Sequence, residues 1–201
     1  MDEHLIVLDK PAGLLAVPGR GPDKQDCLAA RAQALWPDAL VVHRLDMATS
    51  GLVLMARGAA MQRALSRLFE RRLVHKRYEA VVAGRLDGHG TVELPLLVDW
   101  PNRPLQKIDH EHGRPAITHW RALSHDAAAG DTRVSLEPVT GRSHQLRVHM
   151  AALGHPILGD TLYAPPGVQA RAPRLLLHAC ELAFTHPASG ETLRLESRTP
   201  F

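Results

Sequence analysis

The stretch 43–54, HRLDMATSGLVL, places one carboxylate, that of Asp46, between two apolar segments. Short aliphatic runs at 40–42 and 52–55, separated by a polar segment that ends in glycine, predict a strand, a loop and a strand. Asp46 would then be held rigidly and partly desolvated at a sharp connection, which suits nucleophilic or acid–base chemistry. On local chemistry alone, the alternative is a turn-forming Asp that bonds its own backbone.

An ionised carboxylate in a partly desolvated site needs a cation. Without one its pKa rises above about 3.9, and it becomes a poor nucleophile or base. Arg147 lies in TGRSHQLRVH, where a helix is expected, and its planar, permanently charged guanidinium could supply the positive charge. A structural salt bridge would have the same sequence pattern. Tyr78, one of two tyrosines, is expected on a strand, where a half-buried core position is the commoner role.

Two other kinds of site are disfavoured by residue spacing. Ser50 follows Thr49 without the G-x-S-x-G pattern that presents a nucleophilic serine, so a Ser–His–Asp hydrolase is not expected. The chain has 13 histidines, but none shows H-x-x-x-H spacing, and no C-x-x-C pair occurs, in a setting that would close a zinc site. We therefore expect no metal.

Composition limits the broad class of protein. With 201 residues, of which 45% are hydrophobic, the chain has enough apolar residues for one ordinary domain. The formal net charge is only +3, so nucleic-acid binding has to be argued from clusters of charge. Cys27 and Cys180 favour free thiols in a reducing compartment, and there is no signal peptide or long apolar stretch. We expect a soluble, cytoplasmic protein.

The elements that must position these residues can be read from periodicity and turn residues. Strands are predicted at 5–8, 77–84, 91–98, 116–123, 133–139, 175–178 and 193–195; helices are predicted at 27–36 with Asp26 as N-cap, at 58–72, and after Ser143 as N-cap. Many strands and few helices, without βαβ regularity, predict an α+β fold. Its sheet would be mixed and largely antiparallel, with helices packed outside.

Two segments have the charge pattern of an RNA-binding surface. Arg63, Arg67 and Arg71 recur at spacing four on the helix expected at 58–72, which indicates either a solvated helix face or a phosphate-facing patch. The proline-broken segment 99–107 combines Trp100 with basic residues. It could be a stacking and phosphate site, or a loop whose Trp is anchored on the core.

Three motifs together resemble those of the RluA family of pseudouridine synthases: HRLDMATSGLVLMA, KRYEAVVAG and TGRSHQLRVH. The resemblance implies that Asp46 is the catalytic residue and that Arg147 pairs with it. It also implies that Tyr78 stacks on the target base and can take part in proton transfer. Arg44 would enter the RNA in place of the flipped nucleotide.

The resemblance covers nearly the whole chain, and it implies one pseudouridine synthase catalytic domain, 1–201, without a separate N-terminal RNA-binding domain. The segments DWPNRPLQK and GHPILGDTLYA are similar to the short branch of the family, which modifies 23S ribosomal RNA and a tRNA anticodon stem-loop. The expected reaction isomerises uridine to pseudouridine and needs no cofactor, because substrate and product are isomers.

The expected partner is structured RNA, with no membrane and no obligate protein partner. The residues expected to contact RNA are Arg44, His43, Thr49, Arg142, His144, Arg63, Arg67, Arg71, Lys76, Arg103 and Lys107. Two alternatives stay open. One is a catalytically silent RNA-binding protein on the same scaffold, and the other is an RNA-directed hydrolase that releases uracil.

Overall fold

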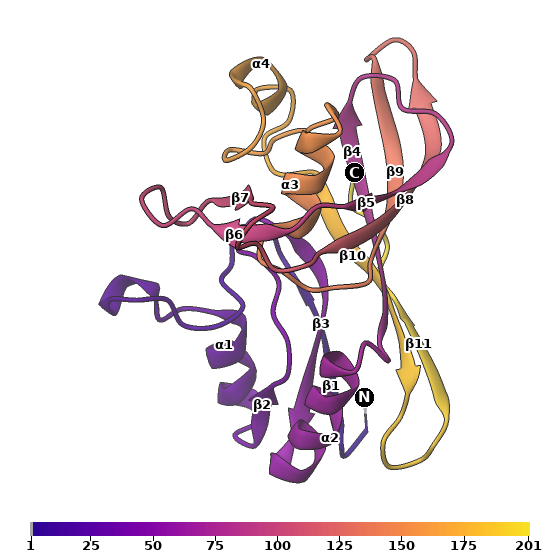
Figure 1. Ribbon diagram of the computed structural model, residues 1–201. Helices are drawn as coiled ribbons and strands as arrows, with labels where there is room; N and C mark the ends of the chain where they lie inside the picture. Colours follow the sequence, from indigo (N-terminus) through magenta and orange to yellow (C-terminus); the bar gives the residue numbers. More distant parts are fainter. Residues whose placement is uncertain (1) are drawn as a thin grey trace. The chain divides into compact units, whose positions relative to one another are not determined.

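A computed structural model describes residues 2–201, and these form two compact units (Figure 1). Unit 1 contains the chain up to His75 together with Ala179–Pro200, and unit 2 contains Lys76–His178 and Phe201. Each is built of antiparallel strands with helices against them. The predicted α+β class with a largely antiparallel sheet is confirmed. The single domain 1–201 stays a prediction.

Unit 1 is organised around one central strand. Its elements are β1 (Leu5–Lys10), a 3-10 turn (Pro22–Lys24), α1 (Leu28–Leu35), β2 (Ala39–Val41), β3 (Ser50–Arg57), α2 (Gly58–Glu70), most of β10 (Leu177–Thr185) and β11 (Thr192–Glu196). Strand β3 pairs antiparallel with both β1 and β2, and β10 pairs with β11. The predicted order of strand, loop and strand around Asp46 is therefore confirmed.

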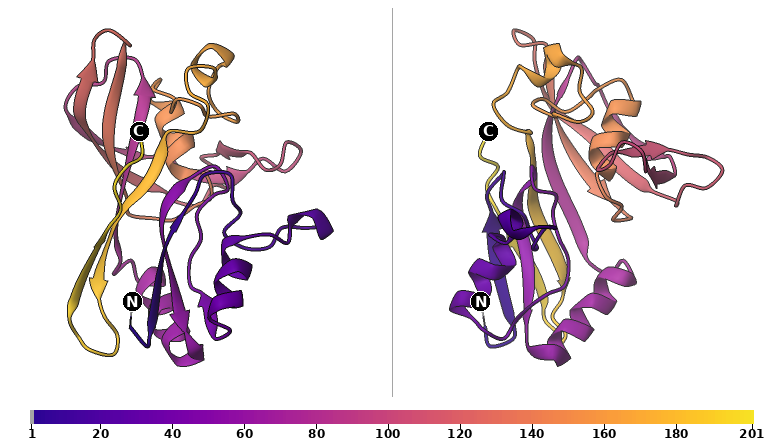
Figure 2. Two further views of the ribbon diagram at one scale, coloured as in Figure 1. Left: turned by 180° about the vertical axis from the view of Figure 1, so that it is seen from behind. Right: turned by 90° about the vertical axis from the view of Figure 1, so that its left-hand side faces the viewer.

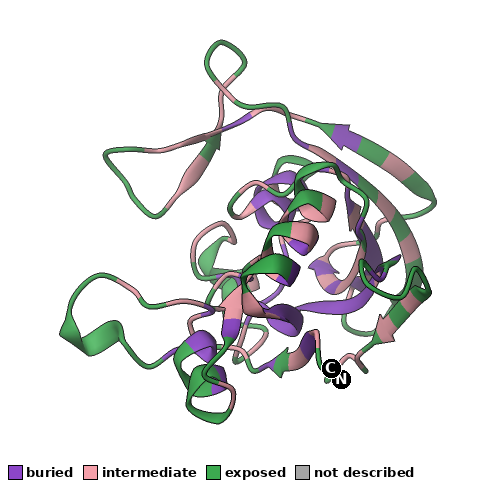
Figure 3. Ribbon diagram, turned by 90° about the horizontal axis from the view of Figure 1, so that it is seen from below, coloured by how far each residue is buried: buried purple, intermediate pink, exposed green. Residues whose placement is uncertain are grey.

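Both faces of β3 are covered, which explains its unbroken apolar sequence. On one face Leu52 and Leu54 pack in a cluster with Leu65 of α2. On the other face Met55 packs with Ala32 of α1. The right-hand view of Figure 2 shows the two helices on opposite sides of these strands. Only Met61 and Leu65 of α2 are buried, and the rest of the helix is half-buried or exposed (Figure 3). The strand that leads away from Asp46 is thus held by packing on both sides.

A close backbone contact marks the start of β3. Gly51 has φ +112°, and a Cβ atom at this residue would lie 2.3 Å from the carbonyl oxygen of Ala179 on β10. Any side chain here would force these neighbouring backbones apart. The glycine after Thr-Ser is therefore required by packing between strands.

Unit 2 contains a four-stranded antiparallel arrangement and a separate hairpin. Strands β4 (His75–Ala83), β9 (Asp131–Pro138), β8 (Ile117–Asp126) and β5 (His89–Glu93) lie in that order, and β6 (Leu96–Val98) pairs with β7 (Gln106–Ile108). The helices are α3 (Gln145–Ala152) and the short α4 (Pro166–Gln169). Val148 of α3 packs with Leu96, Ala116 and Ile108, so α3 is fixed against the hairpin.

The strand expected at 91–98 is wrong in its extent. It is two strands, because Pro95 lacks the N–H that a continuous ladder would use, and the chain changes partner between Glu93 and Leu96. The proline-broken segment 99–107 ends in strand β7.

Two predicted helix caps are also wrong. At α1 the Sγ atom of Cys27 accepts the N–H of Ala30, whereas the carboxylate of Asp26 pairs with Arg31. At α3 the N-cap is His144, with φ 53°, and not Ser143. The side chain of Gln145 accepts the backbone N–H of Arg142 at 3.0 Å, which closes the preceding loop and starts the helix one residue later.

None of the helices in the described part of the chain has the length and apolar character needed to span a bilayer.

A chain of buried polar groups connects α3 to the strands beneath it. Nδ1 of His149 lies 2.9 Å from the hydroxyl of Thr118, and its Nε2 lies 3.0 Å from the carbonyl oxygen of Leu94. Because a carbonyl only accepts, Nε2 carries the proton and Nδ1 accepts from Thr118. The amide of Gln145 donates to the same hydroxyl at 3.0 Å. His149 is therefore built into the fold as a neutral ring.

We predict that protonation of His149 weakens the fold. Burial lowers the pKa of His149 below the value of about 6.5 that it has in an unfolded chain. As pH falls through about 6.5, His149 binds a proton in the unfolded chain but stays neutral in the folded chain. The free energy of unfolding therefore decreases. Thermal midpoints at about pH 7.5 and 5.5 should differ less for His149→Gln than for wild type. The exposed His110→Gln is the control, and an undiminished difference in His149→Gln would contradict the prediction.

Candidate active site

Asp46 lies on a tight turn that leads into β3. The N–H of Thr49 donates to the backbone carbonyl of Asp46 at 3.1 Å, so the residue does begin a turn, as the alternative interpretation expected. Its side chain is half-buried, whereas Thr49 and Ser50 are buried. The turn hydrogen bond uses the backbone oxygen of Asp46 and does not involve its carboxylate.

The turn is fixed from the side by Lys10, at the end of β1. Lys10 is fully buried, and its ammonium group donates to the carbonyl oxygens of Pro11, Leu14 and Met47 at 2.8–3.0 Å. The N–H of Gly13 also donates to the carbonyl of Met47 at 2.8 Å. Two hydrogen bonds from the N-terminal segment therefore hold the residue next to Asp46.

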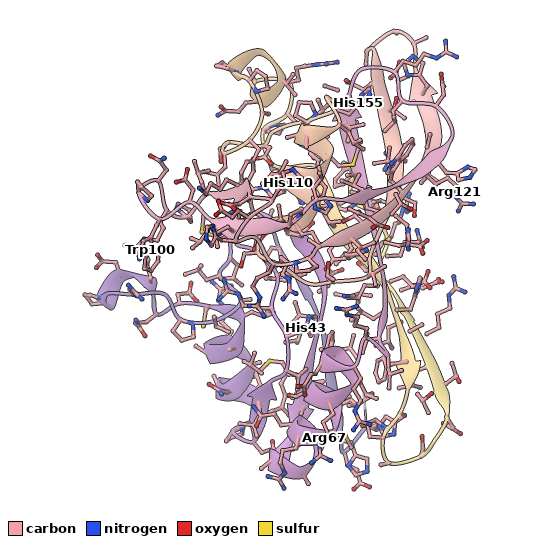
Figure 4. All side chains as sticks on the ribbon, in the orientation of Figure 1. His43, Arg67, Trp100, His110, Arg121 and His155 are labelled. Atoms are coloured by element: carbon pink, nitrogen blue, oxygen red, sulfur yellow. The ribbon has the colours of Figure 1, made fainter. Side chains whose placement is uncertain are left out.

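His43 anchors the other end of the same loop. Its Nε2 accepts the backbone N–H of Leu54 at 2.9 Å, and its ring stacks on Phe69 with 4.4 Å between centroids. The half-buried ring therefore ties the loop both to β3 and to α2 (Figure 4). Arg44, next in the chain, is exposed.

The arginine stripe expected on α2 is exposed. Arg63, Arg67 and Arg71 all face solvent, and within residues 2–201 none has a carboxylate partner. Figure 4 shows Arg67 on the outer side of the helix. Within residues 2–201, these three positive charges are therefore not neutralised by carboxylates of the fold.

In unit 2, Arg147 is buried and is held by a carboxylate that the sequence reasoning missed. Its Nε and Nη2 donate to the two oxygens of Asp160 at 2.8 and 2.5 Å, and the two side chains are 3% and 1% exposed. The backbone N–H groups of Leu162 and Tyr163 also donate to Asp160. This bidentate geometry fixes the guanidinium plane.

Tyr163 joins Arg147 to the neighbouring loops. Its ring centroid is 5.1 Å from Cζ of Arg147, within the range of a cation–π contact. Its hydroxyl lies 2.7 Å from Nδ1 of His144 and accepts the backbone N–H of Gln106 at 2.9 Å. One aromatic side chain therefore connects the helix, the loop before it and the hairpin.

The other predicted residues of unit 2 lie around these elements. Tyr78 is half-buried on β4, opposite Leu136 of β9. Lys76 Nζ is 3.5 Å from the carbonyl oxygen of Thr140, and Arg142 donates to that of Pro115. Arg103 is exposed beside Trp100, and the exposed Lys107 forms an ion pair with Asp109.

The structure brings the predicted residues together in two groups. His43, Arg44, Asp46, Thr49, Arg63, Arg67 and Arg71 belong to unit 1, whereas Lys76, Tyr78, Arg103, Lys107, Arg142, His144 and Arg147 belong to unit 2. The pairing of Asp46 with Arg147 stays a prediction. Within residues 2–201, no group of three or more His, Cys, Asp or Glu side chains is placed to hold a metal ion.

Sequence reasoning missed Lys10, Asp160 and Tyr163. Lys10 ends an apolar strand, where a lysine is expected to be exposed. Asp160 and Tyr163 lie in GDTLY. The only local signal there is a carboxylate that can accept hydrogen bonds from the backbone N–H groups that follow it. That signal predicts a turn, and a turn alone does not indicate contact with a buried arginine.

Comparisons with known proteins found similar sequences. The profile of the RNA pseudouridylate synthase family matches residues 4–152. The chain is 51% identical over 201 residues to the dual-specificity RNA pseudouridine synthase RluA of Escherichia coli K12, covering the whole chain and 91% of that protein. It is 53% identical over 189 residues to the corresponding Vibrio cholerae protein, covering 94% of the chain and 76% of the relative.

The fold is similar to that of solved human proteins. The structure of human RNA pseudouridylate synthase domain containing 1 matches with a TM-score of 0.83 and 28% identity, over all of this chain and 82% of that one. Human RNA pseudouridylate synthase domain containing 4 matches with a TM-score of 0.77 at 28% identity, over all of this chain and 87% of that one.

We predict that the Arg147–Asp160 pair is needed for stability because it is buried. Asp160→Asn should lower the free energy of unfolding by roughly 3–5 kcal/mol, since it removes one charge from a buried pair. The chain offers a matched control in Arg31–Asp26, which has the same bidentate geometry at 2.7 and 2.6 Å but is exposed. Asp26→Asn should leave urea unfolding nearly unchanged. Equal small effects of the two substitutions would show that burial does not decide the outcome.

Proposed function

Because this chain belongs to the RNA pseudouridylate synthase family, we propose that Asp46, Tyr78 and Arg147 are the catalytic residues with which it isomerises uridine in structured RNA. The bond between C1′ of the ribose and N1 of uracil breaks, and the uracil turns while it is held. A bond then forms between C1′ and C5, and the proton of C5 is lost as N1 gains one. Substrate and product are isomers, so no co-substrate enters the balance.

The observation that best supports this assignment is the fixed guanidinium of Arg147. Arginine has five N–H donors, and Asp160 takes one from Nε and one from Nη2. The side chain also cannot lose its charge. Hydrogen bonds from Leu162 and Tyr163 already compensate part of the negative charge of Asp160. We propose that the positive charge of this fixed guanidinium keeps Asp46 ionised, so that the carboxylate can act directly on the target nucleotide.

Tyr78 and Arg44 are proposed to act on the flipped nucleotide and on the gap that it leaves. An extruded base loses its stacking partners, and the ring of the half-buried Tyr78 supplies a replacement surface. Arg44 is exposed two residues before Asp46, and it is proposed to occupy the vacated position in the RNA.

The substrates are proposed to be 23S ribosomal RNA and a tRNA anticodon stem-loop, modified in the cytoplasm. The E. coli relative is named as a dual-specificity enzyme, which supports two substrates. Contacts to RNA are proposed for His43, Thr49, Arg142, His144, Lys76, Arg103 and Lys107, together with Arg63, Arg67 and Arg71 of α2. Phosphate contacts of this kind add affinity without reading sequence.

We predict that Asp46→Asn abolishes pseudouridine formation while the protein still folds and binds RNA. The substitution keeps the shape of the side chain and removes its charge, and Asp26→Asn is the control for loss of a carboxylate elsewhere. Product is measured on a tRNA anticodon stem-loop transcript and a 23S fragment. Turnover near the wild-type rate in Asp46→Asn would overturn the assignment. A wild-type protein that binds these RNAs without product would favour the catalytically silent alternative, and release of free uracil would favour the hydrolase.

We predict that the arginines of α2 contribute affinity but not rate. Replacing Arg63, Arg67 and Arg71 with Gln should weaken binding to all RNAs alike. It should also flatten the salt dependence of binding, by up to about one slope unit for each phosphate that is no longer neutralised. The maximal rate should barely change, because such interactions act equally in the ground and transition states.

The matched control removes three exposed arginines that the fold already pairs with carboxylates, Arg31, Arg85 and Arg194. Both variants lose the same formal charge, so a difference between them reports position. If both triple variants bind RNA with the wild-type salt slope, the stripe is only a solvated helix face.

A further inference from the structure

The β6–β7 hairpin ends in an ordered tip that extends from the rest of unit 2 (Figure 1). Within the loop between the strands, the backbone N–H groups of Asp99, Asn102 and Leu105 donate to carbonyl oxygens of the same loop at 2.9–3.0 Å. The side-chain amide of Asn102 donates to the carboxylate of Asp99 at 2.9 Å. Hydrogen bonds within the loop therefore hold the tip in a defined conformation.

This tip presents a tryptophan to solvent. Trp100 is 65% exposed, although Cζ of Arg103 lies only 3.9 Å from its ring centroid (Figure 4). The guanidinium covers one face of the indole. The exposed area of Trp100 therefore lies mainly on the opposite face. The sequence alternative in which Trp100 anchors the loop on the core is wrong. A large aromatic residue left in water on an ordered loop is typical of a binding surface.

The charge of the tip favours an anionic partner. Within residues 2–201, Arg103 has no carboxylate partner, whereas Lys107 on the following strand forms an ion pair with Asp109. An arginine stacked on an aromatic ring, with its edge free to donate, can contact a base and a phosphate together.

The hairpin also contacts the surroundings of Arg147, one of the two proposed catalytic residues of unit 2. Gln106, at the start of β7, donates its backbone N–H to the hydroxyl of Tyr163, whose ring lies on Arg147. Ile108 packs in one cluster with Val148, the residue after Arg147. The tip is thus held at a fixed place relative to Arg147.

From this geometry we propose that the open face of Trp100, backed by Arg103, is a stacking platform for one unpaired nucleobase of the RNA substrate, separate from the target uridine. The inference rests on the proposed function, because it assumes that the chain binds RNA. Stacking on an aromatic ring accepts any base but requires that the base be unpaired, so the platform would select loops and bulges over duplex.

The test pairs substitutions in the protein with deletions of single bases in the RNA. Wild type, Trp100→Ala and Trp100→Phe are titrated with a labelled tRNA anticodon stem-loop, with the same RNA made abasic at each loop nucleotide other than the target in turn, and with a fully paired duplex. Kd is read by fluorescence anisotropy at one salt concentration, and kcat and KM are measured in parallel. Leu35→Ala removes another highly exposed apolar side chain, 72% exposed, as the control.

We expect Trp100→Ala to weaken stem-loop binding by about 5- to 100-fold, the range for loss of one stacked base, with kcat unchanged at saturation. One abasic position should weaken wild type by a similar factor and have no further effect on Trp100→Ala. Trp100→Phe should retain part of the affinity, and duplex binding should be the same for all variants.

The platform would be overturned if Trp100→Ala bound the stem-loop with wild-type affinity. It would also be overturned if every abasic position weakened binding of Trp100→Ala as much as it weakens binding of wild type. So would a change in oligomeric state without a change in Kd, which would indicate that a second copy of the chain covers the tip. Absence of pseudouridine with wild type would instead count against the proposed function, because Kd is measured independently of turnover.

Discussion

A fully buried ammonium group constrains the loop on which the proposed chemistry depends. Lys10 is shielded from water, so its charge is tolerable only if hydrogen bonds replace the missing hydration. The carbonyl oxygens of Pro11, Leu14 and Met47 provide them, and they can do so only if two distant segments converge on one point. The position of Asp46 is therefore determined largely by a residue 36 places earlier in the chain.

In unit 2, the buried charge of Arg147 is compensated by a residue that is near in sequence. Arg147 and Asp160 are 13 residues apart, and the chain between them is the end of one helix and a turn. Tyr163 then joins this pair to the hairpin. Of the groups proposed to act in chemistry, Arg147 is buried and Asp46 and Tyr78 are half-buried, whereas groups proposed to contact RNA, such as Arg67 and Trp100, are exposed. This division lets RNA affinity change without disturbing the catalytic residues.

Features that produce a periodic pattern in the sequence were predicted, whereas individual side-chain contacts were not. Strand β3 and helix α2 were predicted well because an apolar run and a 3.6-residue period report burial directly. The cap at Asp26 was predicted wrongly because its carboxylate pairs with Arg31, and the cap at Ser143 was predicted wrongly because Gln145 closes the preceding loop and the helix begins one residue later. Asp46 and Arg147 were predicted as catalytic residues from family motifs, and these roles stay predictions. The partner of Arg147, Asp160, was not found, because a bidentate contact across a turn leaves no periodic signal in sequence.

Gly51 has a consequence for how the central motif is interpreted. The residue sits where a single methyl group would collide with the backbone of Ala179, and it lies opposite Lys10 in the β1–β3 ladder. Both residues would be needed even in a relative that had lost its activity, because both maintain the architecture. Matching glycine and lysine in another chain therefore identifies a shared scaffold and carries no information about turnover. Under the proposed assignment, the carboxylate of Asp46 is the group in this neighbourhood that would distinguish an active relative from an inactive one.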